Sequence, residues 1–250
     1  GLWHMWHFHG GYGFKFAELP FAIRHVWAGP RNENRKMIWI AVDKFGKRFR
    51  IDPPAPQDTG TRPLEFYDAD IQDYPRIPCH LIFDEEGRKI GPIGIPIVND
   101  ERYDASWSED NLAEVNKAWI KKGNSLEDIA AQIDVNPKLL KATVERWNEL
   151  CEKGQDEDHK RPPRTMMPIK NPPFYVVEAW PIVNNTQGGP EHDVQQRVLD
   201  PMKRPIPRLY VAGEVSSIYG HLYLEAGNIT ECFVAGKIAG QNAAAERAWS

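Results

Sequence analysis

The feature that most constrains the fold lies near the carboxyl end of the chain. An apolar run, RLYVA, covers residues 208–212, and the polar, glycine-punctuated stretch GEVSSIYGHLYLEAGN follows at residues 213–228. A run rich in small residues begins at Ile229. This order predicts a strand, a loop and a helix that opens on Gly227 and Asn228. Proteins of the α/β class hold ligands in such loops, at the carboxyl edge of a sheet.

The bulk composition excludes several classes of protein. The 250-residue chain has a net charge of −4, so we expect no nonspecific binding to nucleic acid or to an anionic membrane. Its three scattered cysteines, Cys79, Cys151 and Cys232, argue against a disulfide framework and a structural zinc site. No apolar run reaches the roughly 18 residues of a membrane helix, and no signal peptide is visible.

The same considerations give two expectations about the protein as a whole. The low cysteine count favours a cytoplasmic location. The chain starts with Gly1 rather than methionine, so we expect its true start to be missing or processed.

Strand signals occur in both the first and the last third of the chain. Aromatic and histidine residues alternate over residues 1–16 before glycines interrupt the pattern, which predicts a strand entering a loop. Residues 35–52 predict a hairpin that turns at Asp43 to Gly46, and residues 78–91 predict a strand followed by a turn. A strand over residues 174–183 and a hairpin around residues 199–207 come later.

Helix signals fill the middle of the chain. Apolar residues recur at helical spacing over residues 107–122. Two further helices are predicted on either side of Asn136 and Pro137, and Ser125 with Asp128 resembles a capping box at the start of the first.

This helix pair has the outline of a DNA-reading helix-turn-helix. Its second helix mixes acidic with basic residues, and the whole chain is acidic, whereas a DNA reader normally has a basic footprint. We therefore favour a packed helical subdomain. Proline-rich segments and a change of composition further suggest that residues 11–173 are an insertion, flanked by residues 1–10 and 174–250 of another domain.

Residues 204–244 strongly resemble the carboxyl-terminal part of FAD-dependent oxidoreductases of the fumarate reductase and succinate dehydrogenase flavoprotein family, which includes 3-ketosteroid dehydrogenases. The matching features are the strand ending AGE at 212–214, the AGN helix entrance at 226–228, and NTQGGP at 185–190. The resemblance continues upstream through PPFYVVEAWPIV, GKRF and LIFDEEG and covers nearly the whole chain. It implies an α/β fold with an incomplete Rossmann-like FAD-binding domain, residues 1–10 and 174–250, and an inserted α+β capping domain, residues 11–173.

The resemblance implies FAD as cofactor and a set of residues that contact it. A helix that starts after Gly227 presents unpaired N–H groups and a positive dipole end, which would stabilise a negatively charged reduced flavin. Glu214 would accept hydrogen bonds from sugar or ribityl hydroxyls, and Asn228 would cap the helix. The alternative for Gly227 and Asn228 is a helix cap without a ligand, and the alternative for Glu214 is an exposed loop glutamate. The full implied set is Gly213, Glu214, Gly227, Asn228, Ile229, Thr186, Gln187 and Gly188.

The dinucleotide fingerprint of this family is missing from the sequence. No G-x-G-x-x-G occurs, although such a glycine-rich turn holds the pyrophosphate of FAD on backbone N–H groups. The family places it in an amino-terminal segment. We therefore expect a complementary chain, in a hetero-oligomer, or a missing segment that supplies it, and no tight FAD binding by this chain alone.

The resemblance also assigns roles in catalysis. Arg62 matches an arginine that donates a proton near the flavin, with a loop ion pair as its alternative. His9 matches a histidine that holds substrate, and His7 lies on the same predicted strand face. The cluster HMWHFH could also suggest a metal site, but no carboxylate or cysteine follows nearby, so we expect no metal.

The sequence departs from fumarate reductases at the substrate site. Asn185 stands where the family has a histidine, and Leu224 where it has an arginine, which removes most of a clamp for a dicarboxylate. The neighbouring side chains Tyr219, His221 and Tyr223 favour a flat aromatic, enone or steroid-like substrate, with core packing as the alternative.

These observations together predict part of an FAD-dependent oxidoreductase that transfers hydride between flavin N5 and a carbon–carbon bond of a small molecule. Tyr219, Tyr223, Arg62 and His9 are the candidate catalytic residues, and Asn185, His221 and His7 the candidate substrate contacts. Two alternatives remain open: a non-catalytic subunit that completes a partner's flavin fold, and flavin-independent binding of a flat ligand. Reduction and dehydrogenation both stay open as the direction of the reaction.

Overall fold

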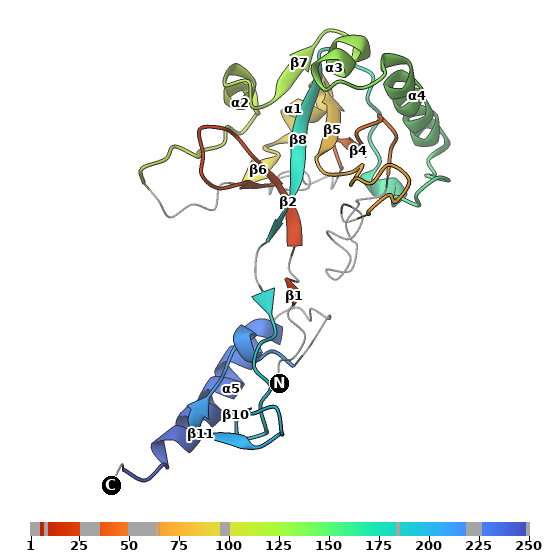
Figure 1. Cartoon of the computed structure of the whole chain (residues 1–250). Coiled ribbons are helices and arrows are strands. Elements are labelled where there is room, and N and C mark those ends of the chain that lie inside the picture. The colour runs from red at the N-terminus through yellow and green to blue at the C-terminus, as the bar shows by residue number, and fades with distance from the viewer. Residues whose placement is uncertain are drawn as a thin grey trace. The chain divides into compact units, whose positions relative to one another are not determined.

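The computed structural model describes residues 6–7, 10–25, 36–49, 64, 66–95, 101–183, 186–218 and 227–248. It contains two compact units (Figure 1). The smaller unit takes its described residues from Gly1–Gly10 and Val183–Ser250, and the larger unit takes its described residues from Gly11–Ala55 and Thr59–Ile182.

The larger unit is built on an antiparallel sheet. Its strands follow the order β4-β5-β8-β2-β3-β6, and β7 pairs with the start of β8. The register of the two longest strands runs from Cys79 opposite Ala179 to Asp84 opposite Phe174. The strand bounds are β2 Gly10–Phe14, β3 Ile23–His25, β4 Ile40–Val42, β5 Cys79–Asp84, β6 Gly94–Ile95, β7 Lys121–Gly123 and β8 Phe174–Val183.

Both faces of this sheet are buried, because alternate residues along its central strands pack into different clusters. On β5, Leu81 and Phe83 belong to one cluster and Ile82 to the other, which also holds Val144 and Trp147 of the helical layer. The six residues of β5 are all buried. Two buried faces explain why its sequence reads as a continuous apolar run rather than as an alternation.

The helical layer on one face is the predicted helix pair, and the structure confirms it. The helices are α3, Leu126–Gln132, and α4, Pro137–Lys153, and Figure 1 shows both beside the sheet. Ser125 and Asp128 form the predicted capping box, and Pro137 occupies the first turn of α4. The apolar face of α4 is buried in the core.

The predicted turn after β5 is wrong, because residues Glu85–Ile90 form a short helix, α1. Asp84 caps it by accepting a hydrogen bond from the backbone N–H of Gly87. Gly87 packs so closely on Ile38 that an added Cβ would lie 3.0 Å from that residue's carbonyl oxygen. Helix α1 therefore packs directly on the segment that leads into β4.

The predicted helix over residues 107–122 is also largely wrong. Only α2, Leu112–Asn116, is helical, and β7 follows at Lys121–Gly123. Asn111 has a left-handed backbone, and its buried amide accepts hydrogen bonds from Ile93 and Trp107 while donating to carbonyl oxygens of Arg88 and Gly91. These tertiary contacts outweigh the helical spacing. Residues Pro163–Thr165 form a short 3-10 turn, η2.

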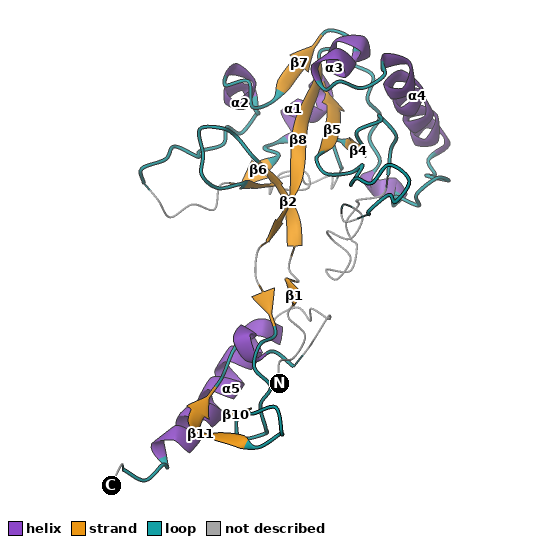
Figure 2. Ribbon diagram, viewed as in Figure 1, coloured by secondary structure: helices purple, strands orange, loops and turns teal. Residues whose placement is uncertain are grey.

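Among the described residues, the smaller unit consists of two strand pairs and one long helix. β1, Trp6–His7, pairs with β9, Thr186–Gln187, and β10, Arg197–Leu199, pairs with β11, Pro205–Tyr210, which confirms the predicted late hairpin. Strand β11 ends two residues before the predicted Ala212. The 3-10 turn η3, Glu214–Ser216, precedes helix α5, Gly227–Ala244, which lies alongside the hairpin in Figure 2.

The border between the units falls later in the chain than the composition indicated. Residues 174–182, predicted to belong to the flanking domain, lie in β8 and so in the sheet of the larger unit. No helix among the described residues is long and apolar enough to cross a membrane.

A buried histidine of β5 gives the larger unit a predictable pH dependence. Burial, assisted by the charge of Lys121, lowers the pKa of His80 to about 4. Because an unfolded histidine has a pKa of about 6.5, protons bind the unfolded chain more readily, and stability falls as pH drops from about 6.5 towards 4.

Substitution His80→Leu should remove this contribution, which amounts to about 3 kcal/mol between pH 7 and 4. Urea unfolding of both proteins at pH 7.5 and 4.5 measures it. The variant should lose less stability on acidification than the wild type, and equal losses would contradict the assignment.

Candidate flavin-binding site

The polar side chains at the start of α5 form a chain of hydrogen bonds with two neighbouring segments. Nε2 of Gln187 on β9 donates to Oδ1 of Asn228 over 2.5 Å, and Nδ2 of Asn228 donates to Oε1 of Glu214 over 2.6 Å. Gln187 and Asn228 are buried. Three residues that lie far apart in sequence are thus brought together at one end of the helix.

Glycines allow the segments around this cluster to approach each other closely. The backbone N–H of Gly188 donates to the carbonyl of Glu214 over 3.0 Å. A Cβ added to Gly189 would lie 2.1 Å from the carbonyl oxygen of Val215, so any other residue would push β9 and η3 apart. Gly213, which precedes η3, has a φ of 83°, a left-handed value that favours glycine.

Asn228 does not act as the predicted cap. It is the second residue of α5 rather than the residue before it, and both ends of its amide are engaged by Gln187 and Glu214. Its side chain therefore ties the helix to β9 and η3. The backbone N–H groups of the first turn keep no partner within the helix, as at any helix start.

Glu231 joins the same buried helix face and was missed in the sequence analysis. Its Oε1 accepts a hydrogen bond from the backbone N–H of Ile218 over 2.8 Å, which ties the residues just after η3 to α5. Positions 228, 231 and 235 are all buried and lie three or four residues apart. This three- and four-residue spacing of 228, 231 and 235 was the sequence signal that could have identified Glu231 as part of the buried face.

The residues present fit the flavin end of FAD better than its phosphates. Gln187 is fully buried, yet its Oε1 has no hydrogen-bond partner within the described structure, so a donor from a ligand would satisfy it. The cluster offers carboxylate and amide groups and no lysine or arginine. Such groups suit hydroxyls and ring N–H groups, whereas the helix start suits negative charge.

Most of the predicted catalytic and substrate residues lie outside the described residues. These are Arg62, His9, Asn185, Tyr219, His221 and Tyr223. Leu224, which replaces an arginine of fumarate reductases, also lies outside the described residues. His7 and Thr186 are described only as members of the paired strands β1 and β9. Ile229 has a side chain that is 66% exposed. The structure thus brings together Gln187, Gly188, Gly213, Glu214, Gly227 and Asn228 of the predicted set.

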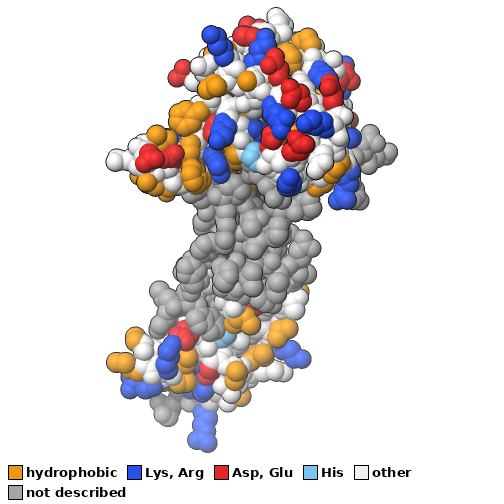
Figure 3. Space-filling model, turned by 90° about the vertical axis from the view of Figure 1, so that its right-hand side faces the viewer, with side chains coloured by type: hydrophobic (Ala, Val, Ile, Leu, Met, Phe, Trp, Pro, Cys, Tyr) orange, Lys and Arg blue, Asp and Glu red, His pale blue; other side chains and the backbone are white. Residues whose placement is uncertain are grey.

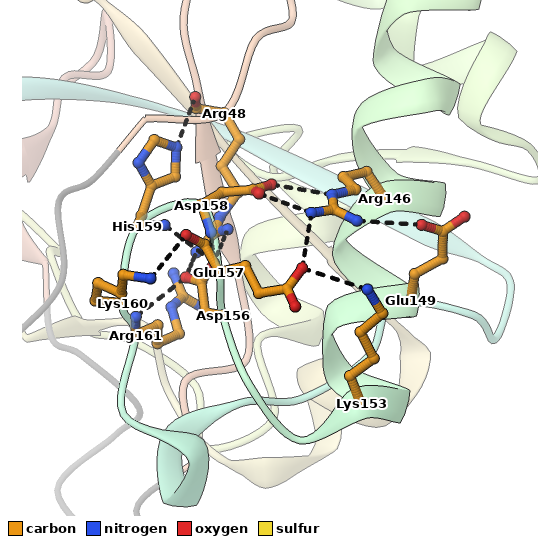
Figure 4. Close-up of polar contacts among 10 residues, drawn as sticks. All are labelled: Arg48, Arg146, Glu149, Lys153, Asp156, Glu157, Asp158, His159, Lys160 and Arg161. Carbon is orange, nitrogen blue, oxygen red and sulfur yellow. Dashed lines mark hydrogen bonds and ion pairs between the residues drawn. The ribbon is translucent and has the colours of Figure 1, made fainter.

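A second polar cluster lies in the larger unit and was not anticipated (Figure 4). Asp156, in the loop after α4, accepts two hydrogen bonds from the guanidinium of Arg48, at 3.0 and 2.5 Å. Burial acts to raise the pKa of Asp156, but Arg48 and backbone N–H donors outweigh it and hold the pKa well below its usual range. Arg48 and Arg161 both lie over the ring of Trp147.

This cluster is accounted for by packing. Arg161 donates to the carbonyl of Trp39, and Arg146 on α4 pairs with Asp158 at 2.8 Å, so the arginines staple the 156–161 loop to the helix and the sheet. Beside it, a cavity of about 440 Å³ is lined mainly by α4 and the turn at residues 45–48. Each of these charges has a protein partner, which favours a structural role.

Comparison with known proteins decides the family. Residues 23–229 match the FAD binding domain family. The chain belongs to that family. Its relatives include reductases named for urocanate and fumarate, and its structural neighbours include a 3-ketosteroid dehydrogenase, as the resemblance implied. The cofactor of the matched family is FAD, the cofactor predicted from the sequence.

The curated relatives are much longer than this chain. It is 32% identical to the urocanate reductase of Eggerthella lenta over 216 residues, which cover 86% of the chain and 32% of the relative. It is 37% identical over 129 residues to the digoxin reductase of the same organism, covering 50% of the chain and 23% of that relative. The chain therefore spans about a third of these relatives or less.

Solved structures of flavoenzymes share the fold. The 3-ketosteroid Δ1-dehydrogenase from Sterolibacterium denitrificans matches with a TM-score of 0.69 and 25% identity, over 96% of this chain and 43% of that one. An open flavocytochrome c3 fumarate reductase matches with a TM-score of 0.57 at 21% identity, over 97% of this chain and 38% of that one, which shows the fold alone. The mixed sheet and helix content agrees with the predicted α/β class.

Proposed function

We propose that this chain is part of an FAD-dependent oxidoreductase that acts on carbon–carbon bonds. The observation that carries the proposal is the buried Gln187, Asn228 and Glu214 cluster at the start of α5, in a chain of the FAD binding domain family. The smaller unit would complete a Rossmann-like FAD-binding domain, and the larger unit would be the capping domain. The glycine-rich part of the FAD site would come from a complementary segment.

The chain's own residues would hold the flavin and move a proton. FAD, when bound, accepts or supplies a hydride at N5, so the protein's task is to bind, orient and polarise. Glu214 and Gln187 offer acceptors to hydroxyl and N–H groups, and the helix start favours negative charge on the ring. Arg62 is our candidate for the proton donor, and because an arginine is normally protonated, it needs a relay that resupplies its proton.

The proposed substrate is a flat ring compound or enone rather than a small dicarboxylate, for example an aromatic compound or a steroid. Asn185 and Leu224 replace the two cations that would hold a small dicarboxylate. Tyr219, His221 and Tyr223 lie in the same stretch and suit a ring system. Relatives named for urocanate, digoxin and 3-ketosteroids support this class, since all three are ring compounds.

The second candidate is a non-catalytic subunit that completes a partner's flavin fold. Leu224 and the missing glycine-rich fingerprint favour it, because an inert partner needs neither. The retained AGE and AGN segments favour the enzyme.

Turnover of the assembled flavoprotein separates the two candidates. The chain is co-expressed with the glycine-rich segment, and urocanate, 1,4-androstadiene-3,17-dione and fumarate are tested with a reduced viologen dye. Arg62→Gln should lower kcat by roughly 100-fold or more, as expected for loss of a proton donor, and Tyr223→Phe should also reduce it. The exposed Arg164→Gln and Tyr67→Phe serve as matched controls. Unchanged turnover in both site variants would favour the inert subunit.

A further inference from the structure

The cavity of about 440 Å³ in the larger unit, which we call the α4 cavity, lies between α4 and the turn that follows β4. Its volume is in the range of small-molecule sites. The turn at residues 45–48 forms one wall, and residues 139–147 of α4 form the other, together with Asp158. The proposed function makes no use of this cavity, so its lining needs a separate account.

The walls of the α4 cavity are held in place by contacts within the protein. Oγ1 of Thr143 on α4 donates to the carbonyl of Gly46 over 2.8 Å, which joins the two walls. The carboxylate of Asp43 accepts hydrogen bonds from the backbone N–H groups of Phe45 and Lys47, both over 2.9 Å. The cavity is therefore preformed, and a ligand would bind without much ordering of the chain.

Two donor groups at the α4 cavity lack an acceptor among the described residues. Arg48 is 8% exposed and its terminal nitrogens bind Asp156, but its buried Nε has no hydrogen-bond partner there. Lys47 is exposed and forms no ion pair with a described residue, whereas Arg146 and Asp158 pair with each other. Because a buried N–H without a partner is uncommon, an acceptor brought by a ligand would complete the site.

Phe45, Leu139, Ala142 and Trp147 supply apolar surface to the lining. Phe45 and Leu139 are 52% and 53% exposed, so large apolar side chains border the opening. The surrounding surface is different: Figure 3 views the side of the larger unit that carries α4 and shows acidic and basic side chains intermingled there. Since protein interfaces are depleted of charge at their centre, an apolar recess in a charged surface favours a small ligand over a protein partner.

We propose that the α4 cavity binds a small hydrophobic carboxylate. The apolar ring of the ligand lies against Phe45, Leu139 and Trp147, and its carboxylate accepts hydrogen bonds from Nε of Arg48 and Nζ of Lys47. An anion fits better than a neutral acceptor, because no described residue neutralises Lys47. The proposal does not rest on the proposed function, since every lining residue belongs to the larger unit.

The test is a titration of the full 250-residue chain with 2-naphthoate, followed by proton–nitrogen correlation NMR. Backbone amides of residues 45–48 and 139–147 should shift saturably, with a Kd of about 1 mM or tighter for a ligand of this size. The uncharged alcohol with the same ring, 2-naphthalenemethanol, should bind about 5-fold more weakly. Succinate, which has no ring, should leave these amides unshifted.

Two substitutions test the cavity itself, each with a matched control. Lys47→Gln should weaken 2-naphthoate by about 5-fold and leave the alcohol unaffected, because it removes only the charge. Lys138→Gln, at an exposed lysine of α4 outside the lining, should change neither. Ala142→Trp should fill the cavity and abolish binding, whereas Ala131→Trp, at an exposed alanine of α3, should not. The same spectra show whether each variant folds.

Three results would overturn the proposal: no shift of the amides around the α4 cavity, equal affinity for 2-naphthoate and the alcohol, or unchanged affinity of Lys47→Gln for 2-naphthoate. Shifts confined to the smaller unit would place the ligand elsewhere and also contradict it. Equal binding by Ala142→Trp and Ala131→Trp would show that the ligand lies outside the cavity.

Discussion

Replacing Asp156 by alanine is expected to lower the free energy of unfolding of the larger unit by about 3–5 kcal/mol, the usual cost of leaving one charge of a buried ion pair alone. Asp156 is 1% exposed, and its only buried counter-ion within the described residues is Arg48, whose guanidinium would remain beneath the loop. Urea unfolding monitored by tryptophan fluorescence measures the loss, since Trp147 stacks on Arg48.

The matched control for this experiment is Asp158→Ala. Asp158 also pairs with an arginine, Arg146 at 2.8 Å, but its side chain is 37% exposed, so its loss should cost no more than about 1 kcal/mol. The Asp156 contribution should be complete at neutral pH, above the pKa of about 4 of an unfolded aspartate, and should be lost in strong acid. Equal effects of the two substitutions would contradict the assignment.

The second large effect concerns the cofactor. In the assembled flavoprotein, Asn228→Leu should weaken FAD binding by about 10- to 100-fold, because the groups of Gln187 and Glu214 that pair with Asn228 lose their partner and their alignment. Titration of the apoprotein with FAD, followed by quenching of flavin fluorescence, gives the Kd. Asn242→Leu near the other end of α5 is the control, since its amide nitrogen donates to the backbone carbonyls of Gln195 and Ile238.

If Asn228→Leu and Asn242→Leu bind FAD equally well, the cluster at the start of α5 is a structural tie between segments and nothing more. If Asn228→Leu alone is impaired, the predicted cofactor contact is supported.

Sequence signals were sufficient to predict elements whose ends are fixed by contacts between residues close together in the sequence. Ser125, Asp128 and Pro137 specify the starts of α3 and α4 by contacts over a few residues, and Gly227 correctly marks the start of α5. The helix predicted over residues 107–122 failed because Asn111 bonds to residues some twenty positions away, and such partners leave no periodic trace.

In the candidate site, too, residues with local sequence signals were predicted and their distant partners were not. The loop motifs pointed to Glu214 and Asn228, but their hydrogen-bond partners depend on how β9 and η3 meet, which glycine packing decides. The pairing of Arg48 with Asp156 joins residues 108 positions apart and has no local signature.

The flavin content of the purified protein tests the central claim most directly. We predict that the chain alone retains no stoichiometric FAD, and that the chain assembled with the glycine-rich segment retains one FAD per complex. A yellow, stoichiometric flavoprotein formed by the isolated chain, or a folded complex that binds no FAD, would contradict the account.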